Sequence, residues 1–473
     1  MQELKPQYSK IHMYTKKIFW GFVWFFPLLT WGQHLGLINQ INPYDSVSER
    51  LEIPIYPKIS SSPMLGKTSR LLPLVDLALN PLPPIEAKGR FGVLYDISKN
   101  HFFARIGGFI GASTTPNNLR EPYLILANKN QGIAHIDPMM RIGVNANRLV
   151  SIQAGYDRNF YGDGFRSLML SDAGSPYPFT SLRFNAGPLT YQFMGMYLSS
   201  TNYQKKYSIN HFLNWKPTKN LQGYLFETVL FNSNDTINYR GFDPNYLNPF
   251  VVIRPTEYAS GSGDNVLLGG GFSVKYKKSK FYGQFIIDDL LISALFNKQK
   301  YWGNKFGGQL GWKYYGKFHE GVLHLRLEAN AIRPYTYAHI GDQLNYSHNG
   351  QVLAHPNGAN FWELFFRGDY LKRSWIILTE LAVGEKGLGL SYGGDINSPY
   401  TLRPSDFSIY TLQGLTTSQF NARIQIAYQL NCLYKLQLFT ELLSTYFINN
   451  SSQKLMICPF IGIKTNVWND YRF

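Results

Sequence analysis

The stretch "NARIQIAYQLNCLYKLQLFTELL", residues 421–443, alternates apolar and polar side chains with a period of two on both sides of a turn near Asn431. The apolar positions are Ile424, Ile426, Tyr428 and Leu430 before the turn and Tyr434, Leu436 and Leu438 after it. The polar positions are Arg423, Gln425 and Gln429 before the turn and Lys435 and Gln437 after it. Because neighbouring side chains of a strand point to opposite faces, the stretch predicts a β-hairpin with one apolar and one polar face.

The same alternation recurs from Phe91 to the end of the chain, for example in "VLHLRLEAN" (residues 322–330) and "PLTYQFMGMYLSS" (residues 188–200). A soluble β-sandwich would alternate too, so periodicity alone does not decide. The polar faces carry long charged side chains that suit a wet lumen, the apolar faces end in aromatic rings, and the chain closes on Phe473. These features favour a transmembrane barrel, since only helices and closed barrels satisfy every backbone group in lipid.

Composition points the same way. Of the 473 residues, 16% are aromatic and 16% are charged, whereas a soluble domain carries about 25% charged residues. Beyond the first few dozen positions there is no apolar run of about 18 residues, as a spanning helix requires. We therefore expect an all-β fold, an antiparallel barrel of about 16–18 strands. Long loops are expected at residues 114–136, 157–177, 232–264, 335–360 and 393–416.

The N-terminal residues are interpreted as targeting sequence. If Met13 is the true start, Lys16, Lys17, the apolar stretch from Ile18 and a cleavage site before Gln33 form a secretory signal. A short membrane anchor is the alternative. The expected organisation is an over-extended start and signal over residues 1–32, a periplasmic extension over 33–86 and the outer-membrane barrel over 87–473. A short helix around residues 71–79, between prolines, is expected in the extension.

The chain has two cysteines, Cys432 and Cys458. Two residues exclude a disulfide framework, and their spacing excludes a C-x-x-C zinc site. Whether the two form a disulfide or remain thiols is open.

The segment "DRNFYGDGFRSLMLSD", residues 157–172, resembles ligand-binding loops only superficially. A calcium loop would need ligands where Tyr161 and Leu168 stand, and a dinucleotide fingerprint would need glycine in place of Ser167. We therefore expect a loop with paired charges that folds inward and plugs or braces the barrel. No metal or cofactor is expected.

No catalytic motif stands out, and an enzyme is not expected. His339, His348 and His355 are spaced too irregularly for a metal site on one strand. The net charge of +16 fits contact with the phosphates of outer-membrane lipid or attraction of an acidic polysaccharide. Nucleic acid is not an expected partner. Aromatic loops rich in Arg, Asp and Asn suit sugars, although the same rings also form membrane girdles.

Four segments occur in an order that resembles a known family. They are "NFYGDGFRSLMLSDAGSPYPF" (159–179), "RGFDPNYLNPFVVIRPTEYASGSGDNVLLGGGFSVKYK" (240–277), "YWGNKFGGQLGWKYY" (301–315) and "RPYTYAHIGDQLNYSHNGQVLAHPNGANFWE" (333–363). Together they look like the Wzi-type capsule-assembly family, in particular its Bacteroidetes branch, which includes the RemB-type gliding-motility proteins. The resemblance implies an outer-membrane barrel with helical elements that plug or flank its periplasmic side.

The resemblance also implies a function. Members of the capsule branch bind and organise exported polysaccharide, and the gliding branch contributes to cell-surface movement. We therefore expect a surface or capsular polysaccharide as the ligand, with gliding or secretion components as further candidate partners. The alternatives are a structural adaptor of a secretion or motility complex and a diffusion porin.

Site residues are carried over only at positions inside the matching segments. Gly162, Gly164 and Pro356 are among these positions, and the two glycines can adopt left-handed backbone angles. The predicted polysaccharide-binding residues are Asn159, Asp163, Arg166, Asp172, Arg254, Glu257, Arg333, Tyr335, His355 and Asn360. Whether these side chains contact sugar or one another is open.

Overall fold

The computed structural model describes residues 68–82, 85–99, 101–113, 124–129, 132–146, 149–232, 242–247, 263–296, 300–431, 435–449 and 452–465. All of them fall within one compact unit that spans residues 50–473.

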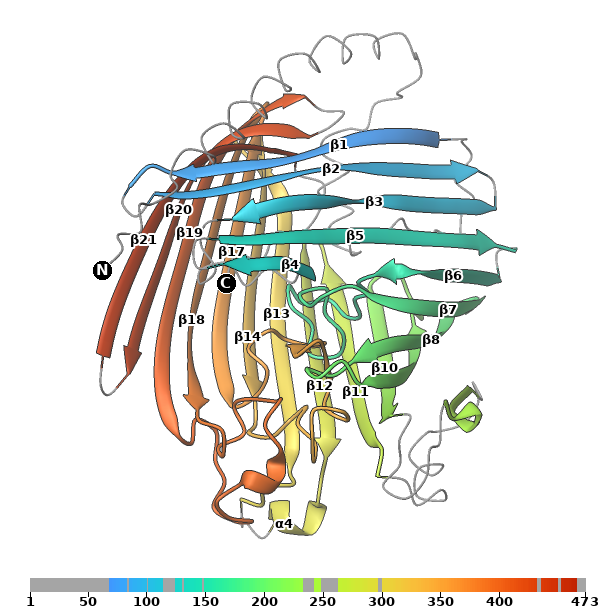
Figure 1. The fold of residues 1–473 in the computed structure, drawn as a ribbon. Coiled ribbons are helices and arrows are strands. Elements are labelled where there is room, and N and C mark those ends of the chain that lie inside the picture. The colour runs from blue at the N-terminus through green and yellow to red at the C-terminus, as the bar shows by residue number, and fades with distance from the viewer. Residues whose placement is uncertain are drawn as a thin grey trace, which may run out of the picture. The chain divides into compact units, whose positions relative to one another are not determined.

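Strands dominate this unit, and Figure 1 traces them in order. In the first half they are β1 (Thr68–Asn80), β2 (Glu86–Lys99), β3 (Phe102–Ser113), β4 (Leu124–Lys129), β5 (Gly132–Asn145), β6 (Val150–Asp157), β7 (Tyr177–Ala186), β8 (Leu189–Ser199), β9 (Lys205–Trp215) and β10 (Leu221–Asn232). In the second half they are β11 (Asn265–Tyr276), β12 (Ser279–Asp289), β13 (Lys305–Phe318), β14 (Gly321–Ile332), β15 (Ser347–His348), β16 (Gln351–Val352), β17 (Phe361–Lys372), β18 (Trp375–Leu388), β19 (Leu415–Asn431), β20 (Leu436–Asn449) and β21 (Ser452–Thr465).

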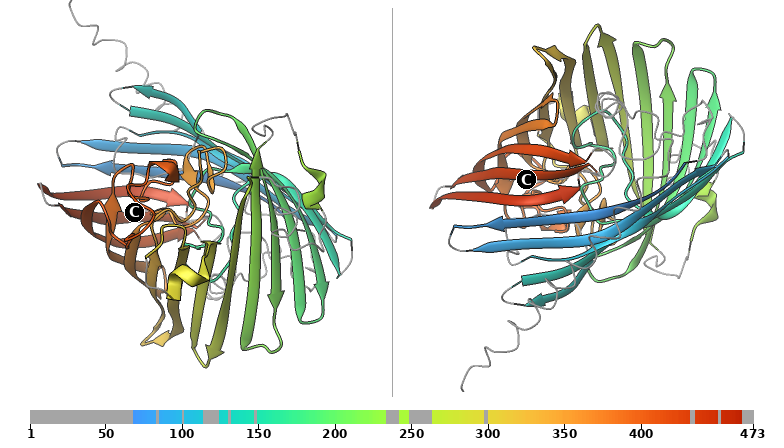
Figure 2. Two further views of the ribbon diagram at one scale, coloured as in Figure 1. Left: turned by 90° about the horizontal axis from the view of Figure 1, so that it is seen from below. Right: turned by 90° about the horizontal axis from the view of Figure 1, so that it is seen from above.

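The strands close into an antiparallel barrel. Each of the long strands pairs with its neighbours along the chain, and β1 pairs with β21 from Asp76↔Lys464 to Leu79↔Ile461. The small strand β4 pairs with residues 132–136 of β5, on the same edge of β5 that pairs with β6 further along, so it adds no strand to the ring and the wall has 18 strands. Both views of Figure 2 show the ring of strands surrounding coiled segments. The expected barrel of 16–18 strands is confirmed.

The alternation of side chains follows the predicted faces. On β14 the outward Leu327 is 48% exposed, whereas its neighbours Arg326 and Glu328 are buried. On β19 the outward Ile424 contrasts with the buried Arg423 in the same way. The wall therefore presents an apolar surface to lipid and a polar surface to the lumen along these strands.

Aromatic side chains mark the end of the wall that carries the short turns. Trp215, Tyr276, Phe318 and Trp375 lie at strand ends beside those turns and are about half exposed. The ring of Trp375 packs edge-on against Tyr428, with centroids 5.0 Å apart. Such a belt is typical of the membrane–water interface.

The connections differ sharply between the two ends. Two-residue turns at 187–188, 277–278, 319–320 and 373–374 join strands at one end, and long connections at 158–176, 233–264, 333–360 and 389–414 lie at the other. The four long connections match predicted loops. The expected loop at 114–136 is wrong over residues 132–136, because β5 begins at Gly132. The remaining part of that predicted loop contains the short strand β4. Since barrels of this class keep their long loops outside the cell, this end faces outward.

The predicted helix around residues 71–79 is wrong. These residues belong to β1, which pairs with β2 over its full length and with β21 at its end. The spacing of the leucines in this segment is compatible with a helix as well as with a strand. The buried Leu74 and Asp76 against the exposed Leu71 and Leu79 show that the strand period prevails, because the ring needs this strand to close. The barrel therefore begins at Thr68, within the segment expected to be the extension.

The helical elements in the described residues are short and lie in the long connections. They are α4 (Ile292–Phe296), η2 (Pro244–Leu247) and η3 (Tyr400–Leu402). The connection that carries α4, residues 290–304, was not among the predicted loops. Within the described ranges, no helix is long and apolar enough to cross a bilayer.

Several sequence expectations fall outside the described residues. These are the signal segment with Met13 and Gln33, the extension up to residue 67, Cys432 and the terminal Phe473. Cys458 lies on β21 opposite Leu443, so its pairing with Cys432 stays an open question.

The outward face supplies a test of the membrane placement. Leu327→Arg, at the middle of β14, should lower the free energy of unfolding by about 2–4 kcal/mol, because it places a charge near the bilayer midplane. Phe318→Arg, at the interface, should cost about 0–1 kcal/mol. Urea titrations in lipid vesicles measure both, and equal costs would contradict the placement.

Candidate functional site

The β6–β7 connection, residues 158–176, folds into the lumen, and Arg141 on β5 anchors its base. The Arg141 guanidinium donates Nε to Asp157 at 3.0 Å and Nη2 to Asn159 Oδ1 at 3.0 Å. Arg158 donates Nε to the carbonyl of Gly174 at 2.7 Å, which ties the start of the segment to its end. This segment is called the plug below.

The tip of the plug reaches the opposite wall through ion pairs. Asp163 pairs with Lys280 on β12 and lies 3.9 Å from the ammonium of Lys313 on β13. Arg166 pairs with Glu363 on β17 at 3.1 Å. All five side chains are buried. Buried charges of this kind require partners, and removing one partner leaves the other uncompensated.

Amide side chains of the wall add hydrogen bonds to the same tip. Gln309 on β13 donates to the carbonyl of Arg166 at 2.8 Å. Gln284 on β12 accepts from the backbone N–H of Leu168 at 3.1 Å and from the hydroxyl of Ser167 at 3.2 Å. The plug therefore spans the lumen from β6 and β7 to β12, β13 and β17.

The charge state of Asp163 follows from two opposed effects. Burial alone would raise the pKa of its carboxyl, but Lys313 and Lys280 outweigh that effect and hold the pKa below its ordinary value. Asp163 is therefore ionised at neutral pH and holds its ion pairs there.

His355 joins the Arg166–Glu363 pair from the β14–β17 connection. Its Nε2 lies 3.1 Å from Glu363, and its Nδ1 accepts the backbone N–H of Asn357 at 3.2 Å. Burial lowers the pKa of His355, and this effect outweighs the carboxylate of Glu363. The ring is thus a neutral donor to Glu363 rather than a cation.

The middle of the plug is apolar. Leu168, Met169 and Leu170 are fully buried in a core formed with wall residues. Those wall residues include Met194, Met196, Leu198, Leu230, Leu267 and Ile286. The expectation of a wet, polar lumen is therefore wrong where the apolar middle of the plug contacts these wall side chains, because they pack like the interior of a soluble domain.

The β14–β17 connection, residues 333–360, packs on the plug through the β15–β16 hairpin. The carbonyl of Leu353 accepts the backbone N–H of Ser171 at 2.7 Å. The hydroxyl of Tyr337 donates to the carbonyl of Leu168 at 2.7 Å. Two inward segments from distant parts of the chain are thus joined by hydrogen bonds.

His348 on β15 links these two segments to the wall. Its Nδ1 accepts the backbone N–H of Ser199 at 3.1 Å, so its Nε2 carries the proton and donates to the carbonyl of Pro176 at 3.2 Å. Burial lowers the pKa of His348 to about 4. Protonation of Nδ1 would remove the bond to Ser199, so the network requires the neutral ring.

Asn360 holds the β18–β19 connection, residues 389–414. Its Nδ2 lies within hydrogen-bonding distance of the carbonyls of Gly387 (3.0 Å), Gln413 (2.9 Å) and Tyr392 (3.2 Å), and its Oδ1 accepts the N–H of Leu412 at 2.6 Å. Asn360 itself adopts a φ of +59°, a left-handed conformation that asparagine tolerates better than most residues.

Tyr335 and Arg333 support the same connection. The hydroxyl of Tyr335 donates to the carbonyl of Ser391 at 2.7 Å and accepts from Gln413 at 3.2 Å. Arg333 Nε donates to the carbonyl of Asn304 at 2.7 Å and Nη2 to that of Ile409 at 3.3 Å. The β12–β13, β14–β17 and β18–β19 connections are thereby tied together.

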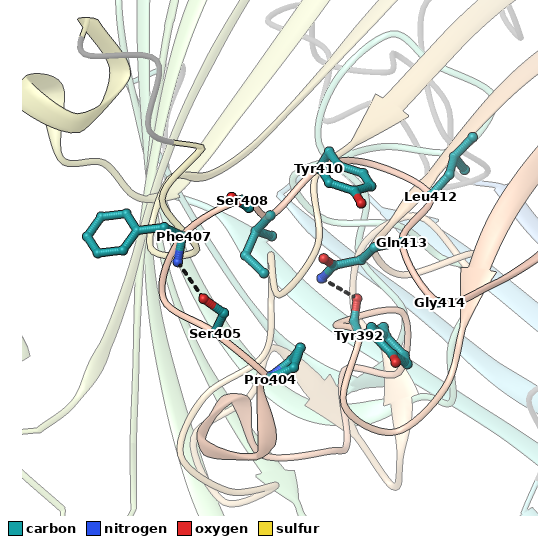
Figure 3. A pocket seen from close by; sticks show the side chains of 10 residues that line it. Tyr392, Pro404, Ser405, Phe407, Ser408, Tyr410, Leu412, Gln413 and Gly414 are labelled. Atoms are coloured by element: carbon teal, nitrogen blue, oxygen red, sulfur yellow. Dashed lines mark hydrogen bonds between the residues drawn. The ribbon is translucent and has the colours of Figure 1, made fainter.

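A pocket of about 390 Å³ opens in the β18–β19 connection. Its lining combines aromatic rings with hydroxyl and amide groups, as Figure 3 shows. The lining residues are Tyr392, Pro404, Ser405, Phe407, Ser408, Ile409, Tyr410, Leu412, Gln413 and Gly414. Tyr410 is 54% exposed, Phe407 47% and Tyr392 38%. Gln413 donates to the carbonyl of Tyr392 at 3.1 Å, a bond between two lining residues that Figure 3 also shows.

The predicted site residues fall into three groups. Asn159, Asp163, Arg166 and Asp172 lie buried in the plug, where Arg166 meets the predicted His355 across Glu363. Arg333, Tyr335 and Asn360 lie beneath the pocket and hold its residues. Arg254 and Glu257 lie outside the described residues. Direct contact of these side chains with sugar stays a prediction.

Sequence reasoning missed two kinds of residue. The wall partners Glu363, Lys280 and Lys313 stand on polar faces that the alternation reveals, but alternation does not say which strands face each other across a lumen. The pocket residues Tyr392 and Tyr410 lie in or beside the predicted loop 393–416, and no motif singled them out. In the described part of the chain, no group of three or more His, Cys, Asp or Glu could hold a metal ion.

Comparison with known proteins identifies the fold. No protein-family model matches the chain, and no curated protein matches it. Among solved structures, the chain is similar to Wzi from Escherichia coli, described as an outer-membrane protein involved in group 1 capsule assembly and a carbohydrate-binding β-barrel. The two share 16% identity and a TM-score of 0.56 over 86% of this chain and 85% of Wzi.

Two porins are more distant. OprD from Pseudomonas aeruginosa matches with 10% identity and a TM-score of 0.45 over 85% of this chain and 97% of OprD. A BenF-like porin from Pseudomonas fluorescens Pf-5 matches with 9% identity and a TM-score of 0.44, over 85% and 99%. The closed barrel with an apolar exterior is an outer-membrane protein, as the sequence predicts.

The ion pair between plug and wall predicts a large stability effect. Arg166→Met should lower the free energy of unfolding by about 3–5 kcal/mol, because it leaves Glu363 buried without its cation. The control is Lys372→Met, whose pair with the exposed Glu320 should be worth about 1 kcal/mol or less. Urea titration in vesicles measures both, and similar losses would show that the Arg166 pair does not brace the plug.

The lowered pKa of His348 predicts acid sensitivity. Because the ring titrates near 6.5 when unfolded but at about 4 when folded, its titration does not change stability above pH 6.5, where the neutral ring keeps its hydrogen bonds. It destabilises the fold progressively below that pH, by about 2 kcal/mol at pH 5. His348→Gln should lower stability at pH 7.5 yet show a shallower loss on acidification. Unfolding curves at several pH values test this, and parallel curves for the two proteins would contradict it.

Proposed function

We propose that this outer-membrane barrel binds surface or capsular polysaccharide at its outward end and organises it there without catalysis. The observation that carries the proposal is the pocket in the β18–β19 connection. In its lining, the partly exposed rings of Tyr392 and Tyr410 lie near amide and hydroxyl groups on the water-facing side of the barrel.

The chemistry of this pocket suits a sugar ring. The rings of Tyr392 and Tyr410 offer flat apolar faces on which a pyranose can stack. Gln413, Ser405 and Ser408 supply donors and acceptors for hydroxyl groups. A volume of about 390 Å³ lies in the range of small-ligand pockets, about 300–1,000 Å³.

The site residues predicted from the sequence would not contact the sugar themselves but would support the residues that line the pocket. Asn360 and Tyr335 hold Tyr392, Leu412 and Gln413 by hydrogen bonds. A binding surface on loops needs such support, because side chains that are not fixed lose more entropy on binding.

The filled lumen favours a surface scaffold over a diffusion porin. The plug crosses the lumen, pairs Asp163 and Arg166 with the far wall and packs an apolar core on the way. A diffusion channel is better served by a clear lumen. The description of Wzi as a carbohydrate-binding barrel agrees with this choice, although that likeness extends to the fold alone.

The expected mode of binding is repetitive and weak. The pocket on each protein would contact one short stretch of polymer. Many copies in the outer membrane hold one chain at many points, so that modest affinities combine into firm attachment.

Sugar retention tests the proposal. Polysaccharide arrays probed with the detergent-solubilised protein should show retention, and Tyr410→Ala should weaken it about 3- to 10-fold, the value of one aromatic contact. Tyr203→Ala is the control, because Tyr203 is 85% exposed at the same end of the barrel but does not line the pocket. An absence of retention on neutral and acidic polymers at high site density would contradict the proposal.

An experiment in cells distinguishes the capsule role from the gliding role. A deletion strain stained for capsule and filmed on agar should lose capsule attachment if the polysaccharide role holds. Loss of movement with an intact capsule would instead place the protein in the gliding machinery, and loss of neither with co-purified periplasmic partners would favour a structural adaptor.

A further inference from the structure

The short-turn end of the barrel carries a dense set of basic residues from β9 to β20. These residues are Lys216, Lys219, Lys277, Lys278, Lys317, Lys372, Arg373 and Lys435. They occupy the turns that join consecutive strands at this end of the barrel, or the strand ends beside those turns. We call this set the basic rim.

In the described part of the rim, acidic residues are scarce. Among the described turn residues and adjoining strand ends from β9 to β20, Glu320 is the single acidic residue. Its carboxylate already pairs with the ammonium of Lys372 at 2.9 Å. The described part of the rim is therefore strongly basic.

The basic rim lies at the level of the aromatic belt. Lys216 follows Trp215, Lys277 follows Tyr276, and Lys317 precedes Phe318 in the chain. The ammonium of Lys277 lies over the ring of Tyr276, 5.2 Å from its centroid. Since outward aromatic rings mark the membrane–water interface, these cations reach the headgroup layer, where long basic side chains extend toward phosphates.

The backbone of the turns supplies an independent observation. Lys277, Arg373 and Lys435 have φ values of 52°, 54° and 50°. This left-handed conformation favours glycine or asparagine, the usual residues of two-residue hairpin turns. Basic side chains thus stand at three turn positions that glycine or asparagine would usually fill.

We propose that the basic rim binds anionic phospholipid headgroups in the periplasmic leaflet of the outer membrane. Phosphates presented by a lipid layer match cations distributed along an arc at headgroup level, and each such cation attracts an anionic surface. A folded acidic protein would instead have to follow the curve of the wall inside the headgroup layer. The inference is independent of the polysaccharide role, which concerns the opposite end of the barrel.

The experiment measures lipid preference directly. The full mature protein is placed in nanodiscs made from equal amounts of phosphatidylglycerol and phosphatidylethanolamine, and the lipids retained on release are counted by native mass spectrometry. The test variant combines Lys277→Asn, Arg373→Asn and Lys435→Asn. Asparagine tolerates the left-handed turn conformation, so this variant should fold at least as well as the parent.

The control removes three cations from the outward end. It combines Lys205→Gln, Lys300→Asn and Arg403→Gln, and Lys300 has the same left-handed backbone, with a φ of 50°. Migration on unheated gels confirms that both variants are folded barrels.

The parent and the control should retain phosphatidylglycerol in preference to phosphatidylethanolamine. The test variant should lose that preference by about fivefold or more, from the attraction of each cation to an anionic surface. The preference should also fall as salt is raised. Equal retention of the two lipids by the parent, or an unchanged preference in the test variant, would overturn the proposal.

Discussion

The hydrogen bonds between β1 and β21 are the constraint on which the rest of this molecule depends. A sheet in lipid cannot keep an open edge, since unpaired backbone groups have no water to bond there. The junction is short, with Asp76–Leu79 facing Ile461–Lys464, and the hydroxyl of Thr465 extends it by accepting the N–H of Val75 at 3.1 Å. Closure at this point fixes the number of strands, and the number of strands fixes the width of the lumen.

That width creates the second problem, because 18 strands enclose more space than their own side chains fill. The long connections at the outward end fold inward and fill this space. The plug carries opposite charges to the wall at Asp163 and Arg166, and apolar side chains between them complete a core. The same filling gives the β18–β19 connection a firm base through Asn360, so one arrangement both obstructs the lumen and shapes the surface that faces outward.

Much of this fold can be read from the sequence, and the limits have physical causes. Alternation in residues 421–443 reveals the hairpin and its faces because the period of two is local. The helix expected around residues 71–79 fails because ring closure, a contact with residues almost 400 positions away, overrides the local pattern. The pairing of Arg166 with Glu363 was equally hidden, since it depends on which strands face each other across the lumen. The inward fold of the plug was predictable from its glycines and paired charges. Its ion pairs and hydrogen bonds with β12, β13 and β17 were not.

The apolar core inside the barrel also decides how the plug can move. If residues 158–176 swung out of the mouth as a rigid lid, Met194, Leu198, Leu267 and Ile286 on the wall and Leu168 to Leu170 on the plug would all be left facing water. Hydration of that much hydrocarbon is unfavourable, so the plug is not a hinged gate. It behaves as a permanent partition, melting together with the strands that surround it.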